Sequence, residues 1–254
     1  MRSLGDVVFS YRCVTIGIRC IFYNRVMKPV LRIDASLDPC PCRPALIWAE
    51  EITEPVASDS LPGPLTDLVR RAAQEGDTFW APDVKGRVRR MLRHGKYKPN
   101  GRAKPASEFL LKAALSGRFP AVNPPVDANN AVSLESGLPG SIFDTTLSGE
   151  RLVLRRGRTG ERYVFNPTGQ EIDLTDLLLV AREESADGRP CGNPVKDSMA
   201  TKIQPDTRRL VAVVYAPADE PVERLEGWAR RYEELLVDWC RAKESGFEIL
   251  DPGP

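Results

Sequence analysis

The stretch FPAVNPPVDANNAVSLESGLPGSIFD, residues 119–144, is nearly free of charge. Only Asp127, Glu135 and Asp144 are ionisable there, in a chain in which 28% of the residues are charged. Its small, polar and apolar residues suit the floor of a pocket, where short polar side chains converge at close quarters. The Gly-Leu-Pro-Gly run at 137–140 predicts a tight bend that brings the backbone close to that pocket. A buried connector, in which Asn and Asp only cap turns, is the alternative.

The spacing within this stretch is more specific than its composition. It reads V-D-x-x-N, then L-E-x-G-x-P, then F-D, without an insertion. In this it resembles the B3/B4 editing domain of the phenylalanyl-tRNA synthetase beta subunit, and the resemblance covers about residues 98–217. The matching residues are Val126, Asp127, Asn130, Leu134, Glu135, Gly137, Pro139, Phe143 and Asp144, followed by Leu147, Gly149, Arg155, Gly160 and Glu161.

Two residues depart from the family pattern. Asn129 stands where the family usually has Thr, and Ser141 stands where it has a His that lines the editing pocket. Loss of imidazole at Ser141 removes bulk and leaves a small hydroxyl, which predicts a roomier pocket that accepts a long polar side chain.

The resemblance implies an α+β fold, a B3/B4-like α/β sandwich with a mixed sheet and surrounding helices. It also implies a deacylase that acts in trans on mischarged aminoacyl-tRNA, for example tRNA for arginine charged with canavanine or another polar amino acid. We expect no metal and no cofactor. The candidate catalytic residues are Asn129, Asn130 and Ser141, and the candidate substrate-binding residues are Asp127, Glu135, Gly137, Gly140, Lys196, Asp197 and Thr201.

The chemistry that the residues permit agrees with this expectation. His94 is the only histidine and lies away in sequence from residues 119–144, and there is no GxSxG motif or Gly-rich phosphate loop. An aminoacyl-tRNA ester is already activated, so its hydrolysis needs a positioned water and donors for the developing oxyanion rather than a strong nucleophile. Backbone N–H groups at 137–141 could supply those donors.

Residues 85–104 carry nine Lys or Arg residues and no acid. They predict a surface for RNA phosphates, on which Tyr97 could stack against a base. A solvated helix face whose charges pair with acids elsewhere is the alternative. The candidate tRNA-binding residues are Arg89, Arg90, Arg93, Lys96, Tyr97 and Lys98.

Composition limits the possibilities further. The 36 Lys and Arg residues balance 35 Asp and Glu residues, so any RNA contact requires local segregation of charge. The six cysteines are irregularly spaced and no secretory signal is evident, which favours reduced thiols in the cytoplasm. We expect residues 1–26 to be a disordered extension or a mis-assigned start, and residues 27–254 to form a single domain.

Hydrophobic periodicity predicts the elements of this domain. Strands are expected at 30–36, 45–52, 151–154, 162–165, 177–182 and 207–215, and helices at 61–74, 82–95, 105–115 and 220–243. The apolar stripe of the last helix is typical of core packing.

Two other functions remain open. An RNA-binding or partner-binding module could keep the fold without hydrolysis, and the absence of the family's pocket His at Ser141 favours it. A hydrolase of small amino esters without tRNA is the other, and the near-zero net charge favours that one.

Overall fold

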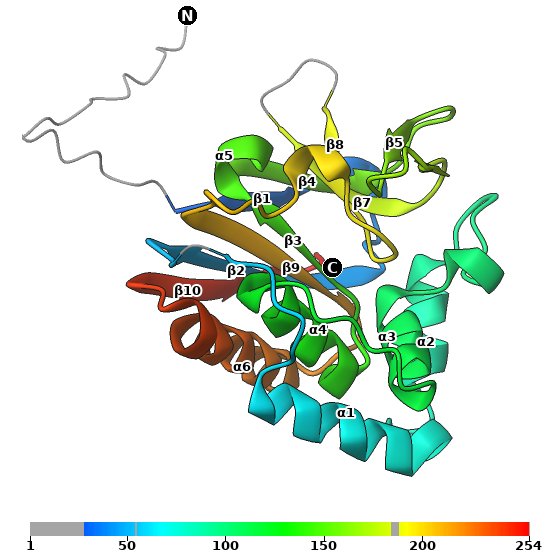
Figure 1. The fold of residues 1–254 in the computed structure, drawn as a ribbon. Coiled ribbons are helices and arrows are strands. Elements are labelled where there is room, and N and C mark those ends of the chain that lie inside the picture. Colours follow the sequence, from blue (N-terminus) through cyan, green and yellow to red (C-terminus); the bar gives the residue numbers. More distant parts are fainter. Residues whose placement is uncertain (1–27, 54, 184–187, 254) are drawn as a thin grey trace, which may run out of the picture.

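The computed structural model describes residues 28–53, 55–183 and 188–253, and the predicted extension at 1–26 lies outside them. The predicted α+β fold is confirmed. Figure 1 shows a layer of helices against one sheet, with a second sheet on the far side of the first. None of the helices in the described ranges is long and apolar enough to cross a membrane.

The central sheet has the strand order β10-β2-β9-β3, and all of its neighbours are antiparallel. These strands are β2 (Cys42–Glu50), β3 (Gly140–Asp144), β9 (Arg209–Pro217) and β10 (Glu244–Ile249). Strand β9 is buried along almost its whole length. Its unbroken apolar and β-branched sequence reflects this burial on both faces.

The second sheet has the order β1-β4-β7-β8 and is mixed, because β1 and β4 are parallel whereas the other pairs are antiparallel. Its strands are β1 (Val30–Ile33), β4 (Arg151–Arg156), β7 (Leu178–Arg182) and β8 (Pro190–Gly192). A small ribbon of β5 (Arg162–Val164) and β6 (Glu171–Asp173) lies beside it.

Helices α4 (Pro124–Ser136) and α6 (Val222–Cys240) pack on the central sheet, on the side away from the second sheet (Figure 1). Helices α1 (Gly63–Glu75) and α3 (Ala106–Leu115) pack against α4, and α2 (Val84–Leu92) lies near β9. The short helix α5 (Thr145–Ser148) follows β3. Single 3-10 turns occur at Ala35–Leu37, Gly76–Thr78, Gly101–Ala103 and Met199–Thr201.

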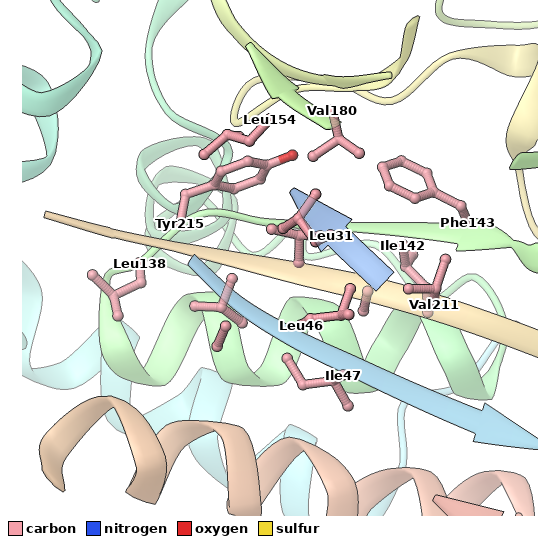
Figure 2. Close-up of a cluster of buried hydrophobic side chains, with 14 of the residues drawn as sticks. Leu31, Leu46, Ile47, Leu138, Ile142, Phe143, Leu154, Val180, Val211 and Tyr215 are labelled. Atoms are coloured by element: carbon pink, nitrogen blue, oxygen red, sulfur yellow. The ribbon is translucent and has the colours of Figure 1, made fainter. Parts of the chain in front are cut away.

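The core lies between the two sheets and continues under the helices. Figure 2 shows Tyr215 of β9 beside Leu154 and Val180 of the second sheet, in a cluster that also contains Phe143 of β3. Each fully buried side chain of this kind contributes about 1.5–3 kcal/mol. This core fixes β3, which carries one wall of the site.

Most predicted elements are present, with shifted ends. The expected strand at 30–36 ends at Ile33, because the Asp34 side chain caps a 3-10 turn by accepting a 3.0 Å hydrogen bond from the Ser36 N–H. Strand β10 was not predicted, and neither was the helix over Pro124–Ser136.

Candidate functional site

A cavity of about 290 Å³ opens between α4, the start of β3 and the loop that follows β8. Its walls combine small polar side chains with a few apolar ones and with charged groups from one loop. The lining residues are Ala106, Val122, Asn123, Val126, Asn129, Asn130, Gly140, Ile142, Asn193, Val195, Lys196, Asp197, Lys202 and Ile203.

The N-terminus of α4 forms one side of this cavity. The Asn123 side chain accepts a 3.1 Å hydrogen bond from the Val126 N–H, and Pro124 occupies the first helical position. Asp127 is buried and accepts a 3.0 Å hydrogen bond from the Val122 N–H. Burial raises the pKa of Asp127 to about 6, against the effect of this hydrogen bond. These caps fix the helix turn that presents the polar side chains.

Asn129 is held at both ends of its amide. Its Nδ2 donates to the Gly140 carbonyl at 3.5 Å, and its Oδ1 accepts a 3.1 Å hydrogen bond from the Tyr232 hydroxyl. A Cβ on Gly140 would lie 2.5 Å from the Asn129 Oδ1, so only glycine fits there. Asn130 has no such partners among the described residues and is half-buried at the cavity wall, where its amide can meet a ligand or a water.

Asp197 supplies the carboxylate of the cavity. Its Oδ2 accepts a 3.1 Å hydrogen bond from the Ile142 N–H, whereas its Oδ1 is buried without a partner among the described residues. Burial raises the pKa of Asp197 to about 7, although the Ser141 hydroxyl and the Ile142 N–H oppose the rise. Near neutral pH this group is therefore a proton donor, a proton acceptor or a counter-ion, depending on what enters.

The loop carrying Asp197 is fixed by a buried polar network. Both the Val195 and Lys196 N–H groups donate to the Asn193 Oδ1, at 2.8 and 3.0 Å. The Asn193 Nδ2 donates to the Tyr163 hydroxyl, which in turn donates to the Lys196 carbonyl. At its other side, the Ala106 N–H at the start of α3 donates to the Pro194 carbonyl at 2.8 Å. Fully partnered networks of this kind hold a loop in one arrangement.

Part of the chain matches a known protein family. Residues 95–226, just over half of the chain, match the B3/4 domain family. The chain belongs to the B3/4 domain family. All of the cavity-lining residues lie within the matched segment of this B3/4 domain.

Two phenylalanyl-tRNA synthetase beta subunits are similar to this B3/4 domain protein. The chain is 35% identical, over 140 residues, to the phenylalanine–tRNA ligase beta subunit of Symbiobacterium thermophilum. The match covers 54% of this chain but 14% of that subunit. The crystal structure of an N-terminal fragment of the phenylalanyl-tRNA synthetase beta subunit from Pyrococcus horikoshii is similar with a TM-score of 0.42 and 10% identity, over 87% of this chain and 52% of that one.

The B3/4 domain brings together only part of the predicted site. Asn129, Asn130, Gly140, Lys196 and Asp197 line the cavity. Asp127 does not line it and is held by the hydrogen bond that it accepts from the Val122 N–H.

Ser141 does not line the cavity, which corrects the expectation from the family pattern. Its side chain is fully buried on the opposite face of β3 from Gly140 and Ile142, because successive strand residues alternate. The hydroxyl donates to the Asn193 carbonyl at 3.2 Å and accepts a 3.0 Å bond from the Tyr215 hydroxyl. Ser141 therefore supports the loop rather than contacting the content of the cavity.

Glu135, Gly137 and Thr201 also lie away from the cavity. Because residues 124–136 form a helix, Glu135 lies on another face of α4, 3.5 Å from an Arg71 nitrogen in a second cavity between α1, α4 and α6. Gly137 adopts φ 76° as the C-cap of α4, where a Cβ would collide with Val84. The Thr201 hydroxyl is buried and donates to the Cys191 carbonyl at 2.8 Å.

The charges of the cavity are mainly those of its loop. The Lys196 ammonium lies 3.6 Å from the centre of the Phe165 ring, and desolvation lowers its pKa. The Lys202 ammonium donates to the Phe165 carbonyl at 2.9 Å. The lining therefore carries both signs of charge, with the Lys196 and Lys202 ammonium groups and the Asp197 carboxyl group.

The basic segment at 85–104 is partly neutralised. Arg89 makes two 2.6 Å hydrogen bonds to Glu108, so its guanidinium is already occupied. Tyr97 is 9% exposed and its hydroxyl donates to the Ala103 carbonyl, so this ring is not available to stack on a base. Arg90, Arg93, Lys96 and Lys98 are exposed. The segment therefore offers exposed cations without the expected aromatic residue.

The sequence interpretation missed four residues that shape the site, namely Tyr163, Asn193, Lys202 and Tyr232. Asn193 lies three residues before the predicted site residue Lys196, so the sequence prediction could have included it. Tyr232 belongs to an ordinary apolar helix stripe and carries no signal of its own.

None of the described ranges contains a group of three or more His, Cys, Asp or Glu side chains placed to hold a metal ion. The described cysteines Cys40, Cys42, Cys191 and Cys240 are buried free thiols, and burial raises the pKa of each. They are inert core residues rather than nucleophiles.

Proposed function

We propose that this protein hydrolyses the ester bond of mischarged aminoacyl-tRNA. One observation carries the proposal: a cavity lined by Asn129, Asn130, Gly140 and Asp197 lies within the segment that matches the B3/4 domain. Its volume of about 290 Å³ is at the lower end of the range for ligand pockets, which suits an aminoacyl group attached to one ribose.

Hydrolysis of the ester proceeds through attack by water, formation of an oxyanion and departure of the ribose oxygen. Water attacks the ester carbonyl carbon and the carbonyl oxygen becomes an oxyanion. The carbonyl then re-forms as the bond to the ribose oxygen breaks, and the proton that the attacking water loses passes to the ribose oxygen. The Ile142 N–H points away from β9 toward Asp197, and the Gly140 N–H, two residues earlier, points to the same edge. The Gly140 N–H is our choice for an oxyanion donor.

Asn130 is our choice for orienting the attacking water, because its amide faces the cavity without a partner in the described residues. Asn129 keeps the Gly140 carbonyl turned toward α4 through its 3.5 Å contact. It acts as a positioning residue for the strand edge on which the oxyanion forms.

Asp197 determines the preferred amino acid in this proposal. A carboxylate whose pKa is about 7 becomes fully ionised when a cation binds beside it, so a cationic side chain or the substrate α-ammonium would pair with it. We therefore expect esters of arginine-like or other polar amino acids to be better substrates than the tyrosyl ester of tRNA for phenylalanine. A site that hydrogen-bonds such a side chain discriminates strongly, since an analogue leaves buried polar groups unpaired.

The test is a deacylation assay over a panel of mischarged tRNAs with the wild type, Asn130→Ala and Asp197→Asn. Asp238→Asn, on the exposed face of α6, is the matched control for loss of one carboxylate. We expect the two cavity variants to lose at least ten-fold in kcat/KM and the control to match the wild type. Binding of the tRNAs without release of any amino acid would contradict hydrolysis and favour an RNA-binding module. Hydrolysis of small amino esters but of no aminoacyl-tRNA would favour a hydrolase that acts without tRNA.

A further inference from the structure

Phe109 on α3 lies just beyond the basic segment at 85–104 and is 37% exposed. It lies at the mouth of a separate cavity of about 160 Å³ between α2 and α3. Lys85, Lys104 and Lys112 line this cavity together with Phe109 and the exposed Leu115. An aromatic ring among ammonium groups is the arrangement that single-stranded nucleic acids use, because bases stack on the ring and phosphates meet the cations.

The charges around Phe109 are unevenly balanced. Among the described residues, none of the three lysines has a carboxylate within salt-bridge distance. Glu108, which also lines this cavity, is neutralised by Arg89 at 2.6 Å. Asp77 is the remaining acid of the lining, so the surface has an excess of positive charge that a polyanion would satisfy.

Helix α3 connects this surface to the candidate active site. Ala106 lines the catalytic cavity, and Phe109 follows three residues later on the same helix. Residues three apart are neighbours on a helix surface, with Cβ atoms about 5–6 Å apart. Phe109 therefore lies close to the wall of the cavity that Ala106 forms.

We propose that Phe109 and the lysines around it hold the unpaired 3′ end of a tRNA, with a terminal base stacked on the ring and the adjoining phosphates at Lys104 and Lys112. This proposal rests on the proposed function, because it assigns the polynucleotide part of the same substrate. It also moves the stacking role from Tyr97, which is buried, to a residue that the sequence did not indicate.

The test measures binding of an uncharged acceptor-stem minihelix, with and without its unpaired 3′ end, by fluorescence anisotropy. Phe109→Leu keeps an apolar side chain for packing but removes the aromatic face, whereas Phe109→Trp keeps it. We expect Phe109→Leu to lose roughly five- to hundred-fold in affinity for the minihelix with the unpaired end, and Phe109→Trp to bind like the wild type. Val237→Ala, an exposed apolar residue of α6 that lines neither cavity, is the matched control and should bind like the wild type.

The outcomes separate this surface from the catalytic proposal. Equal affinities of the wild type and Phe109→Leu for the intact minihelix would overturn the stacking role, whatever the deacylation assay shows. A loss that is the same for the minihelix lacking its unpaired end would also overturn it, because no base would then be read by the ring. If Phe109-dependent binding persists while no mischarged tRNA is hydrolysed, the surface stands and hydrolysis does not.

Discussion

The Ser141 hydroxyl donates a 3.2 Å hydrogen bond to the main-chain carbonyl of Asn193, and this bond joins strand β3 to the loop that carries Asp197. The same hydroxyl accepts from Tyr215 at 3.0 Å, inside the core between the sheets. The wall of the cavity is thus anchored to the most buried part of the molecule. Ser141, which the family pattern predicts to determine specificity, therefore supports the loop instead.

Replacement of Ser141 tests this supporting role. Ser141→Ala should lower the free energy of unfolding by about 1–3 kcal/mol, because the buried Tyr215 hydroxyl then lacks its acceptor. Ser141→His should destabilise the protein further, since a fully buried site has no room for an imidazole. Urea unfolding measures both. A stable Ser141→His variant with a raised preference for the tyrosyl ester would restore Ser141 as a specificity position.

Gly140→Ala probes the packing of β3 on α4. Its Cβ would lie 2.5 Å from the Asn129 Oδ1, so Asn129 must rotate and lose its bond from Tyr232. We expect kcat/KM for deacylation to fall at least ten-fold. Gly227→Ala, in the middle of α6 with open space around its Cα, is the control and should gain about 0.5–1 kcal/mol of stability with unchanged activity. Unchanged activity in Gly140→Ala would place the reaction elsewhere.

Asp197 makes stability depend on pH in a defined direction. Burial raises its pKa from 3.8 to about 7, so the folded protein binds this proton more tightly than the unfolded chain does. The free energy of unfolding should therefore fall as the pH rises from about 4 to about 7. Asp127, with a pKa of about 6, acts in the same direction, so Asp197→Asn should remove part of the slope and not all of it. Chemical denaturation at several pH values measures this, and an identical slope in the variant would contradict the assignment.

Mutations can distinguish the exposed cations of the basic segment at 85–104 from Arg89, which is paired with Glu108. Arg90→Gln with Arg93→Gln removes two exposed cations, and the slope of log K against log salt for tRNA should become shallower by about 0.9 for each phosphate that these cations neutralise. Arg89→Gln should instead lower stability by about 1–3 kcal/mol, because it leaves the Glu108 carboxylate without its partner. An unchanged salt slope in the double variant would move the RNA surface away from this segment.

His94 is exposed beyond the end of α2 and does not line the cavity proposed as the active site. We therefore expect His94→Ala to keep kcat within about two-fold, and activity to survive chelators, as the sequence predicts. Steady-state rates with and without a chelator are the measurement. A collapse of turnover at unchanged tRNA affinity would require a mechanism that uses the imidazole.

The sequence predicted the fold class, because it depends on patterns within short segments, and five of the predicted site residues line one cavity. Strand β9 followed from its unbroken apolar and β-branched sequence, and helix α6 followed from its apolar periodicity. Many residues of the family pattern are structural, however, and their types alone do not reveal this. Asp144 caps α5 by accepting from the Thr146 N–H at 2.7 Å, and Arg155 is buried with Glu161 at 2.6 Å. From the sequence alone, a charged residue with a structural role such as Asp144 cannot be distinguished from a charged residue of a binding site.

The predictions that were wrong, on the helix and on Glu135, also depended on the direction of an element. The helix over residues 124–136 has no amphipathic stripe, because it is buried by α3, α6 and β3 on several sides, and so periodicity did not indicate it. Without that helix, Glu135 could not be assigned to a different face from Asn130. The side of a helix or strand on which a residue lies depends on an element's direction, which the residue type does not encode.

The hydrogen bond from the Ala106 N–H to the Pro194 carbonyl joins the first turn of α3 to the loop of Lys196 and Asp197. A displacement of α3 by RNA would therefore be transmitted mechanically to the groups that meet the amino acid. Thermodynamic reciprocity then applies: if RNA alters the affinity of the cavity for an aminoacyl group, the aminoacyl group alters the affinity for RNA by the same factor. If that factor exceeds one, an aminoacyl-tRNA is held longer than an uncharged tRNA, and hydrolysis itself then favours release of the product.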